Sequence, residues 1–282
     1  MVYFDQVLHI IDLIITAIAN CAYSFLNSNF GIATTGSFFG AVGGYLAVFF
    51  TNRRAEILSR IGRMKIAIAL TDGLFNLAYN LNSQHLFELN LRYMNSKKKF
   101  SALESGNIID LEKEITYDLK AILIPKIDFE LINSQLLRET GFMGRAYSLA
   151  TVLIHSLRDL ERFIEIRQSL IDKIDFRSAK NDFELDQKIR LFFGLRVSSP
   201  RGNYIDEQYS DIMEGIKISV ESSIWFSREL VLQMIEEAKI EASKIYMFRP
   251  KIGSVDYSNV DQKYLPNDLN FKDWRKNFTR AK

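Results

Sequence analysis

Apolar residues dominate the first fifth of the chain and recur with helical spacing through most of the remainder. Residues 30–50 (FGIATTGSFFGAVGGYLAVFF) form an uncharged run of 21 residues. At 1.5 Å per residue, a helix of this length measures roughly 31 Å, which matches a bilayer core of about 30 Å. Arg53 and Arg54 follow the run, and basic residues beside a span favour the cytoplasmic side. We therefore expect a membrane-spanning helix whose C-terminal end faces the cytoplasm.

Residues 2–26 form a second apolar stretch, which a regular series of polar positions crosses. Neighbouring members are three or four residues apart, so they form one narrow stripe on a helix: Asp5, His9, Asp12, Thr16, Asn20, Ser24 and Asn27. In one interpretation the helix spans the bilayer, and the stripe lines a pore or forms a hydrogen-bonded seam between helices. In the other it lies in the membrane interface with the stripe toward water. The absence of Lys and Arg from the stripe favours the spanning interpretation.

Glycines recur every four residues within the run 30–50, at Gly36, Gly40 and Gly44. This spacing puts them on one face of a helix, where the missing side chains let another backbone approach closely. The pattern is that of a glycine zipper. It predicts a helix–helix contact face and favours a homo-oligomer.

Helical periodicity continues in four later segments: 53–103, 129–174, 181–194 and 205–247. Between them, 104–128 indicates a loop with a short helix and a proline break, and 198–203 indicates a plain loop. The prediction is an all-α fold, with a transmembrane helical hairpin, or one span plus an amphipathic helix, in residues 1–52. A cytoplasmic helical bundle follows in 53–248. Residues 249–282 form an irregular tail that packs on the bundle.

Composition adds a sharp division between these regions. Residues 1–52 hold no Lys or Arg, and the formal net charge of the whole chain is +2. So mild a charge does not indicate a nucleic-acid partner. The tail mixes basic residues with aromatic ones, a combination that fits contact with nucleic acid or anionic lipid. We prefer the alternative, in which the aromatic side chains fix the tail to the bundle.

Candidate chemistry is sparse. The three histidines are dispersed, and the single cysteine lies in the apolar segment, so neither type predicts a metal site. None of the common nucleophile, phosphate-loop or zinc-protease motifs occurs in the soluble part. We expect no enzymatic activity and no cofactor.

The chain resembles a little-characterised family of bacterial proteins that have an N-terminal membrane segment and a helical cytoplasmic domain. The resemblance covers most of residues 30–280. It rests on the glycine-rich span with Arg53-Arg54, Gly144-Arg145, Ile154–Leu157 with Arg167, Phe192–Leu195, Asp206–Tyr209, Ser222–Leu230, and the ending Leu265-Pro266, Trp274 and Phe278. It implies the same architecture and supplies no catalytic residues.

Two functions fit these features. The first is a bacterial inner-membrane effector of phage defence or stress, which oligomerises through its N-terminal helices and permeabilises the membrane. The second is a membrane-tethered scaffold, in which the hairpin is an anchor and the bundle docks a cytoplasmic protein partner. Membrane lipid is the expected partner in both.

Overall fold

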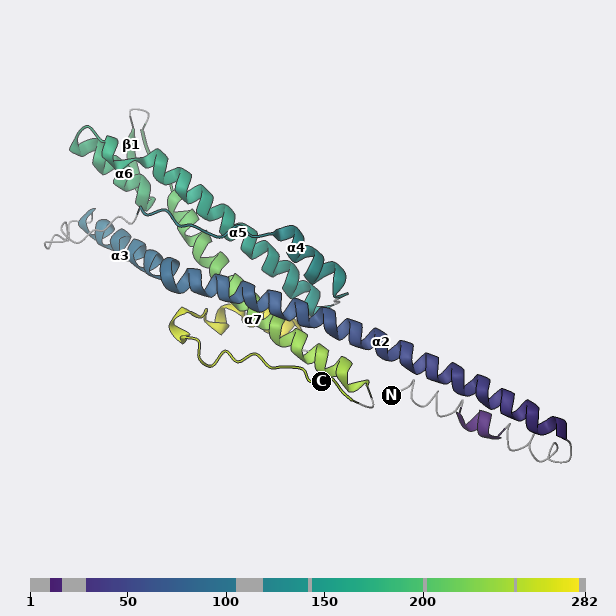
Figure 1. Cartoon of the computed structure of the whole chain (residues 1–282). Coiled ribbons are helices and arrows are strands. Elements are labelled where there is room, and N and C mark those ends of the chain that lie inside the picture. The colour runs from purple at the N-terminus through teal and green to yellow at the C-terminus, as the bar shows by residue number, and fades with distance from the viewer. Residues whose placement is uncertain are drawn as a thin grey trace. The chain divides into compact units, whose positions relative to one another are not determined.

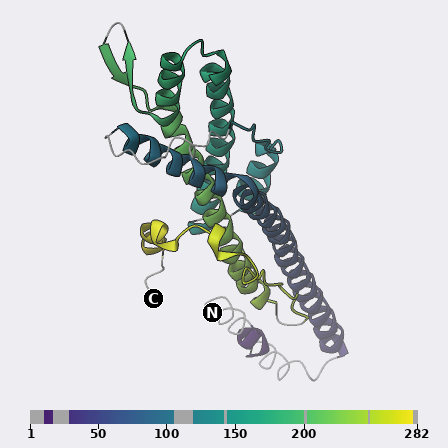
Figure 2. The ribbon, with the colours of Figure 1, turned by 90° about the vertical axis from the view of Figure 1, so that its left-hand side faces the viewer.

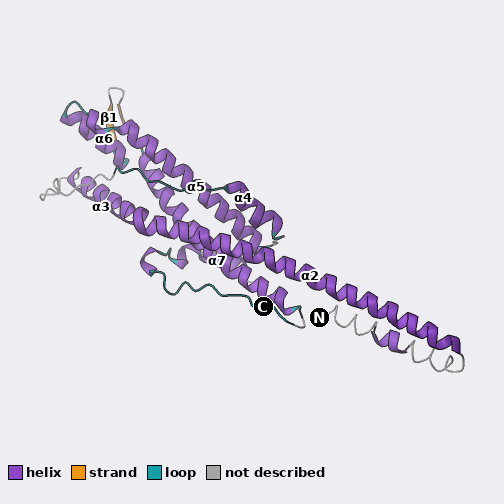
Figure 3. Cartoon of the chain, in the orientation of Figure 1, coloured by secondary structure: helices purple, strands orange, loops and turns teal. Residues whose placement is uncertain are grey.

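The computed structural model describes residues 11–16, 29–104, 119–141, 144–199, 202–245 and 248–278, which are predominantly helical (Figure 3). The predicted all-α class is therefore confirmed at the level of helical content. By packing, the chain divides into two compact units, Met1–Ser59 and Arg60–Lys282.

The first unit contains a short helical segment at residues 11–16 and the N-terminal part of helix α2 (Asn29–Leu81). Side chains in this part of α2 are described from Phe39 onward. Among the described residues, none of the helices combines the length and the apolarity that crossing a bilayer requires.

Helix α2 continues into the second unit, where a π-helical turn (Asn82–Leu86) joins it to helix α3 (Phe87–Glu104). The helical pattern predicted over 53–103 is thus confirmed, with one local change of winding. One face of α2 is buried in this unit at intervals of three or four residues, through Ile61, Met64, Ala67, Thr71, Leu74 and Ala78, and Phe75 beside Leu74 is buried as well.

Helices α5 (Arg145–Ile174) and α7 (Gln208–Ser243) make the most extensive helix–helix contact of the second unit (Figure 1). Every fourth residue of α7 is small over four positions: Gly215, Ser219, Ser223 and Ser227. The Phe163 ring of α5 lies against Gly215, 2.9 Å from where a Cβ would stand. The buried hydroxyls of Ser223 and Ser227 donate to the carbonyls of Ser219 and Ser223, at 2.8 and 2.6 Å. These short polar side chains are therefore satisfied within the helix while the neighbouring elements approach closely.

The predicted single helix over 129–174 is wrong. Residues Phe129–Asn133 form α4, a π-helical turn follows at Ser134–Glu139, and the chain then turns before α5 begins at Arg145. Gly141 and Gly144 both have positive φ, at 64° and 61°, a backbone conformation that ends a right-handed helix. The apolar positions on both sides keep helical spacing, which is why the pattern read as one helix.

The predicted helix at 181–194 is confirmed as α6 (Asp182–Phe193), and the loop predicted at 198–203 is wrong. Two short antiparallel strands occupy this region, β1 (Arg196–Ser199) and β2 (Gly202–Ile205), near the end of α6 and the start of α7 (Figure 2). Val197 is buried and pairs with Tyr204. Four-residue strands of mixed polarity are too short to produce an alternating pattern, so Pro200 and Gly202 dominated the sequence signal.

The C-terminal residues 248–278, which we call the C-terminal strap, follow α7 mostly as irregular chain. Two 3₁₀ turns (Gln262–Tyr264 and Asp268–Phe271) and the short helix α8 (Lys272–Phe278) are its regular parts. Asn267 accepts a hydrogen bond from the Leu269 backbone N–H at 3.0 Å, which fixes the start of the second turn.

Replacing Gly194 with alanine should destabilise the second unit by about 1–2 kcal/mol. Gly194 ends α6 at φ 66°, and an added Cβ would stand 3.1 Å from the Ser210 Cβ and 3.2 Å from the Glu207 Cα. Denaturant unfolding followed by circular dichroism measures the loss.

The matched control is Gly73→Ala, because Gly73 lies inside α2 with nothing within 4 Å of its added Cβ. There the higher helix propensity of alanine should raise stability by up to about 1 kcal/mol. Equal effects of the two substitutions would contradict the strain assigned to Gly194.

Candidate functional site

An aromatic contact fastens the C-terminal strap to the middle of α7. The rings of Trp225 and Phe271 are stacked, with centroids 4.6 Å apart and an interplanar angle of 9°. The Phe226 ring makes T-shaped contacts with Trp274 and Phe271, with ring centroids 5.0 and 5.8 Å apart. Trp225, Phe226 and Phe271 are all buried. Aromatic pairs in these arrangements stabilise by about 0.5–1.5 kcal/mol beyond the area that they bury.

Beside these rings, the Asp268 carboxylate accepts hydrogen bonds from three side chains. One oxygen accepts from the Trp225 indole N–H at 3.1 Å and from the Arg228 guanidinium at 2.6 Å. The other oxygen accepts from Arg275 of α8 at 3.0 Å. Trp225 and Arg228 are three residues apart on α7, so both donors lie on one face of that helix. Helix α7 thus presents a ready-made binding site for one carboxylate of the strap.

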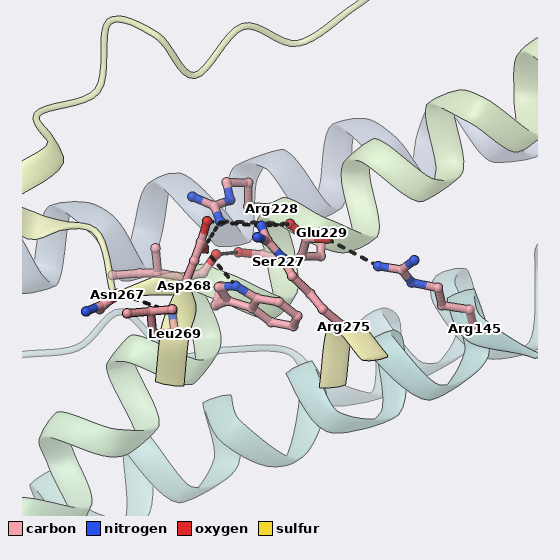
Figure 4. A network of polar contacts seen from close by, with 10 residues as sticks. Arg145, Ser227, Arg228, Glu229, Asn267, Asp268, Leu269 and Arg275 are labelled. Atoms are coloured by element: carbon pink, nitrogen blue, oxygen red, sulfur yellow. Dashed lines mark hydrogen bonds and ion pairs between the residues drawn. The ribbon is translucent and has the colours of Figure 1, made fainter. Parts of the chain in front are cut away.

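A second carboxylate, Glu229, extends this network toward α5 (Figure 4). Glu229 lies 3.3 Å from Arg145, 3.5 Å from Arg275 and 3.8 Å from Arg228. Its side chain is 12% exposed, whereas those of Asp268 and Arg275 are 43% and 44% exposed. We call these five residues, Arg145, Arg228, Glu229, Asp268 and Arg275, the arginine clamp. Three positive and two negative groups give it a formal charge of +1.

The arginines determine the protonation of the strap carboxylate. Burial by itself raises the pKa of Asp268, but hydrogen bonds and charge from Arg228, the charge of Arg275 and the Trp225 indole lower it below its ordinary value. The docked carboxylate is therefore held in its charged form. Its exposed position limits the energy of each ion pair, and surface pairs contribute about 0–1 kcal/mol.

The other half of the strap contacts α2 and the turn that follows it. The Tyr257 hydroxyl donates to the Asp72 carboxylate at 3.2 Å, and its ring lies 4.6 Å from that of Phe75. Burial and the Asp72 charge raise the pKa of Tyr257, so this hydroxyl remains a donor. Further along, the Tyr79 hydroxyl of α2 accepts a hydrogen bond from the Asp261 backbone N–H at 3.2 Å. The Asn82 side-chain amide of the π-helical turn donates to the Tyr264 carbonyl at 2.9 Å. Lys263 forms an ion pair with Glu88 of α3 at 3.4 Å. The strap therefore joins α2 to α7.

These contacts hold the strap against α7. Aromatic rings supply the buried contact area, and charge-assisted hydrogen bonds fix the register of the strap on α7. Among the described residues, no group of three or more His, Cys, Asp or Glu is placed to hold a metal ion. His85 lies exposed in the π-helical turn and His155 lies exposed on α5.

The glycines predicted as a contact face lie on α2. A Cβ built on Gly40 or on Gly44 meets nothing within 4 Å, so the space above both is open in this chain. The side chains around Gly36 lie outside the described residues.

Of the predicted polar stripe, Asp12 and Thr16 fall in the described helical segment 11–16. The Thr16 hydroxyl donates to the Asp12 carbonyl at 2.7 Å, which places the two residues one helical turn apart on the same side. Asp5, His9, Asn20, Ser24 and Asn27 lie outside the described residues.

The arginine clamp was not predicted from the sequence. Its members come from α5, α7 and the strap, and Asp268 lies 40 residues from Arg228 along the chain. The available signal was the aromatic composition of the tail together with the pair Trp225-Phe226, and neither feature identifies the carboxylates.

The substitution Glu229→Gln should destabilise the second unit by about 2 kcal/mol. It keeps the shape but removes the charge that balances Arg145 and Arg275 at a largely buried position, where hydrogen bonds to charged groups contribute about 1.5–3 kcal/mol. Thermal and urea unfolding of the purified chain measure the change.

The control is Glu236→Gln, a substitution at an exposed position of the same helix, which should alter stability by less than about 0.5 kcal/mol. If Glu229→Gln is as mild as this control, the clamp does not hold the strap.

Comparison with known proteins adds no identity to this geometry. No family model, no curated protein and no solved structure matches the chain. The resemblance to a bacterial membrane family therefore stays a prediction, and the function has to be argued from the residues themselves.

Proposed function

We propose that this protein is a bacterial inner-membrane effector, in which the N-terminal helices of several copies assemble and permeabilise the membrane. Its helical second unit lies on the cytoplasmic side and controls that assembly. A system of phage defence or stress response is the setting that such a self-damaging activity fits. The observation that carries the proposal is the exposed apolar surface of α2 around its open glycine face.

Large apolar side chains are exposed around the axis of α2 in the first unit. Tyr45, Val48 and Phe50 are 70%, 59% and 50% exposed. With about 100° between successive helical residues, these three side chains point in different directions. A helix that is apolar on all sides is stable in a lipid or protein environment and unfavourable in water.

The glycine face gives such a helix a way to meet a second copy. Gly36, Gly40 and Gly44 follow one another at intervals of four, and the last two have open space where side chains would stand. Close approach of two backbones at small residues is the usual basis of helix association in membranes.

The basic residues after the run 30–50 favour an orientation in which the second unit faces the cytoplasm. Arg53, Arg54, Arg60, Arg63 and Lys65 follow the apolar run within fifteen residues, and no Lys or Arg precedes it. Under the positive-inside rule, this asymmetry keeps the second unit in the cytoplasm.

The test is the membrane potential of a bacterial host during induced expression. Wild type should depolarise the cells and arrest growth, whereas Gly40→Leu should reduce depolarisation to the level of an empty vector, because a leucine blocks the close approach of two helices. Carbonate extraction of the membrane fraction verifies that both proteins are inserted at equal amounts.

The control is Ala41→Leu, which adds a similar volume at the neighbouring position, about 100° around the helix from Gly40. It should depolarise as wild type does. Full activity of Gly40→Leu would contradict assembly through the glycine face. A wild type that reaches the membrane without depolarising it would favour the alternative, a tethered scaffold that docks a cytoplasmic partner.

A further inference from the structure

We infer that the C-terminal strap is a releasable fastener between α2 and α7, and that its release switches on the membrane activity. The second half of this inference rests on the function proposed above. The first half stands on the contacts of the strap itself.

The strap occupies one face of α2. Its contacts fall on Asp72, Phe75 and Tyr79, which are separated by three or four residues and so share a side of the helix, and on Asn82, which begins the π-helical turn after it. On α7 it occupies Trp225, Arg228 and Glu229. The strap is therefore bound at two sites on two helices, with its irregular backbone between them.

Little of the strap is buried compared with the helices beneath it. Among its residues with described side chains, 248–276, Pro266 and Phe271 are buried, and the others are half-buried or exposed. By contrast, five consecutive residues of α7, from Ser223 to Ser227, are buried. Segments with few buried apolar groups and irregular backbone open at lower free energy than a packed core. The strap is thus positioned to leave while α5 and α7 stay paired.

The bonds that hold the strap are of a kind that an outside group can replace. Asp268 and Arg275 are more than two-fifths exposed, and Lys263 pairs with Glu88 of α3 at the surface. Tyr257 and Tyr264 each share one part-buried hydrogen bond, with Asp72 of α2 and with Asn82 of the following turn. Because the Asp268 carboxylate is half-exposed, water or another anion can reach it and take its place on Arg228. The closed state therefore rests on one aromatic anchor, on half-buried apolar side chains such as Ile252 and Leu265, and on polar contacts that are individually weak.

Release has a defined structural result. It uncovers Trp225 and Phe226 on α7 and Phe75 on α2, which are 1%, 2% and 1% exposed when the strap is docked. It also removes the connection that the strap makes between α7 and α2. Because α2 is the helix that contains Gly40 and Gly44, the strap acts on the same element that the proposed assembly uses.

The chain carries its own probe of this event. Its two tryptophans, Trp225 and Trp274, both lie at the contact between strap and α7. For the full-length chain purified in detergent, the tryptophan emission should shift to longer wavelength at a lower urea concentration than the loss of helical circular dichroism at about 222 nm. Coincident transitions in the wild type would overturn the inference, because the strap would then be an integral part of the core.

Variants then test the clamp. Asp268→Asn removes the charge held by Arg228 and Arg275, so it should lower the midpoint of the fluorescence transition and leave the helical transition unchanged. Asp273→Asn, at an exposed acid of α8, is the matched control and should leave both transitions unchanged. Equal fluorescence midpoints for the two variants would show that the clamp does not fasten the strap.

The same two variants, Asp268→Asn and Asp273→Asn, test whether the strap controls the proposed membrane activity. In the depolarisation assay, Asp268→Asn should act at an expression level several-fold lower than the wild type requires, and Asp273→Asn should match the wild type. If wild type depolarises and Asp268→Asn does so no earlier, the regulatory role is overturned. If no variant depolarises, the proposed function fails and the membrane role of the strap with it, while the urea transitions still decide whether the strap is releasable.

Discussion

The structure of the second unit depends on covering the middle of α7 from every side. Five successive buried residues, Ser223–Ser227, cover more than one full turn of the helix, so no side of it faces water there. Helix α5 packs along α7, with Phe163 against Gly215, and the side with Trp225 and Phe226 is covered by Phe271 and Trp274 of the strap. The strap therefore covers the aromatic side of α7 from some 40 residues further along the chain.

The arginine clamp beside these aromatic contacts explains why the strap docks on α7 in one register. Aromatic contacts alone are non-directional over small shifts, but the Asp268 carboxylate has three donors from two elements and fits in one position. Glu229 holds Arg145 and Arg275 from the other side, and thus connects α5, α7 and α8. The buried aromatic contacts contribute most of the free energy of docking, and the arginine clamp fixes the position of the strap along α7.

Helix α2 places two different surfaces on one element. From Phe39 to Phe50 its large side chains are apolar and most of them are exposed, whereas in the second unit its exposed positions are mostly polar and its apolar face is buried. A continuous helix can carry both because its backbone hydrogen bonds are internal and do not depend on the solvent. Such a helix connects the exposed apolar segment of the first unit to the packed second unit without a break. The strap contacts it from Asp72 to Tyr79, within the second unit.

The sequence by itself determined the features that depend on local spacing. The buried faces of α2, α5 and α7, the end of α6 at Gly194 and the division of charge at residue 52 could all be read from residues a few positions apart. Only the tertiary structure decided where 129–174 breaks, because glycines such as Gly141 are tolerated inside helices until packing selects the left-handed conformation. The same holds for the pairing of Val197 with Tyr204 and for the three partners of Asp268. Contacts between distant segments leave no periodic signal, because each residue type in them is common on any protein surface. Such a residue acquires its role only when folding brings its partner within hydrogen-bond distance.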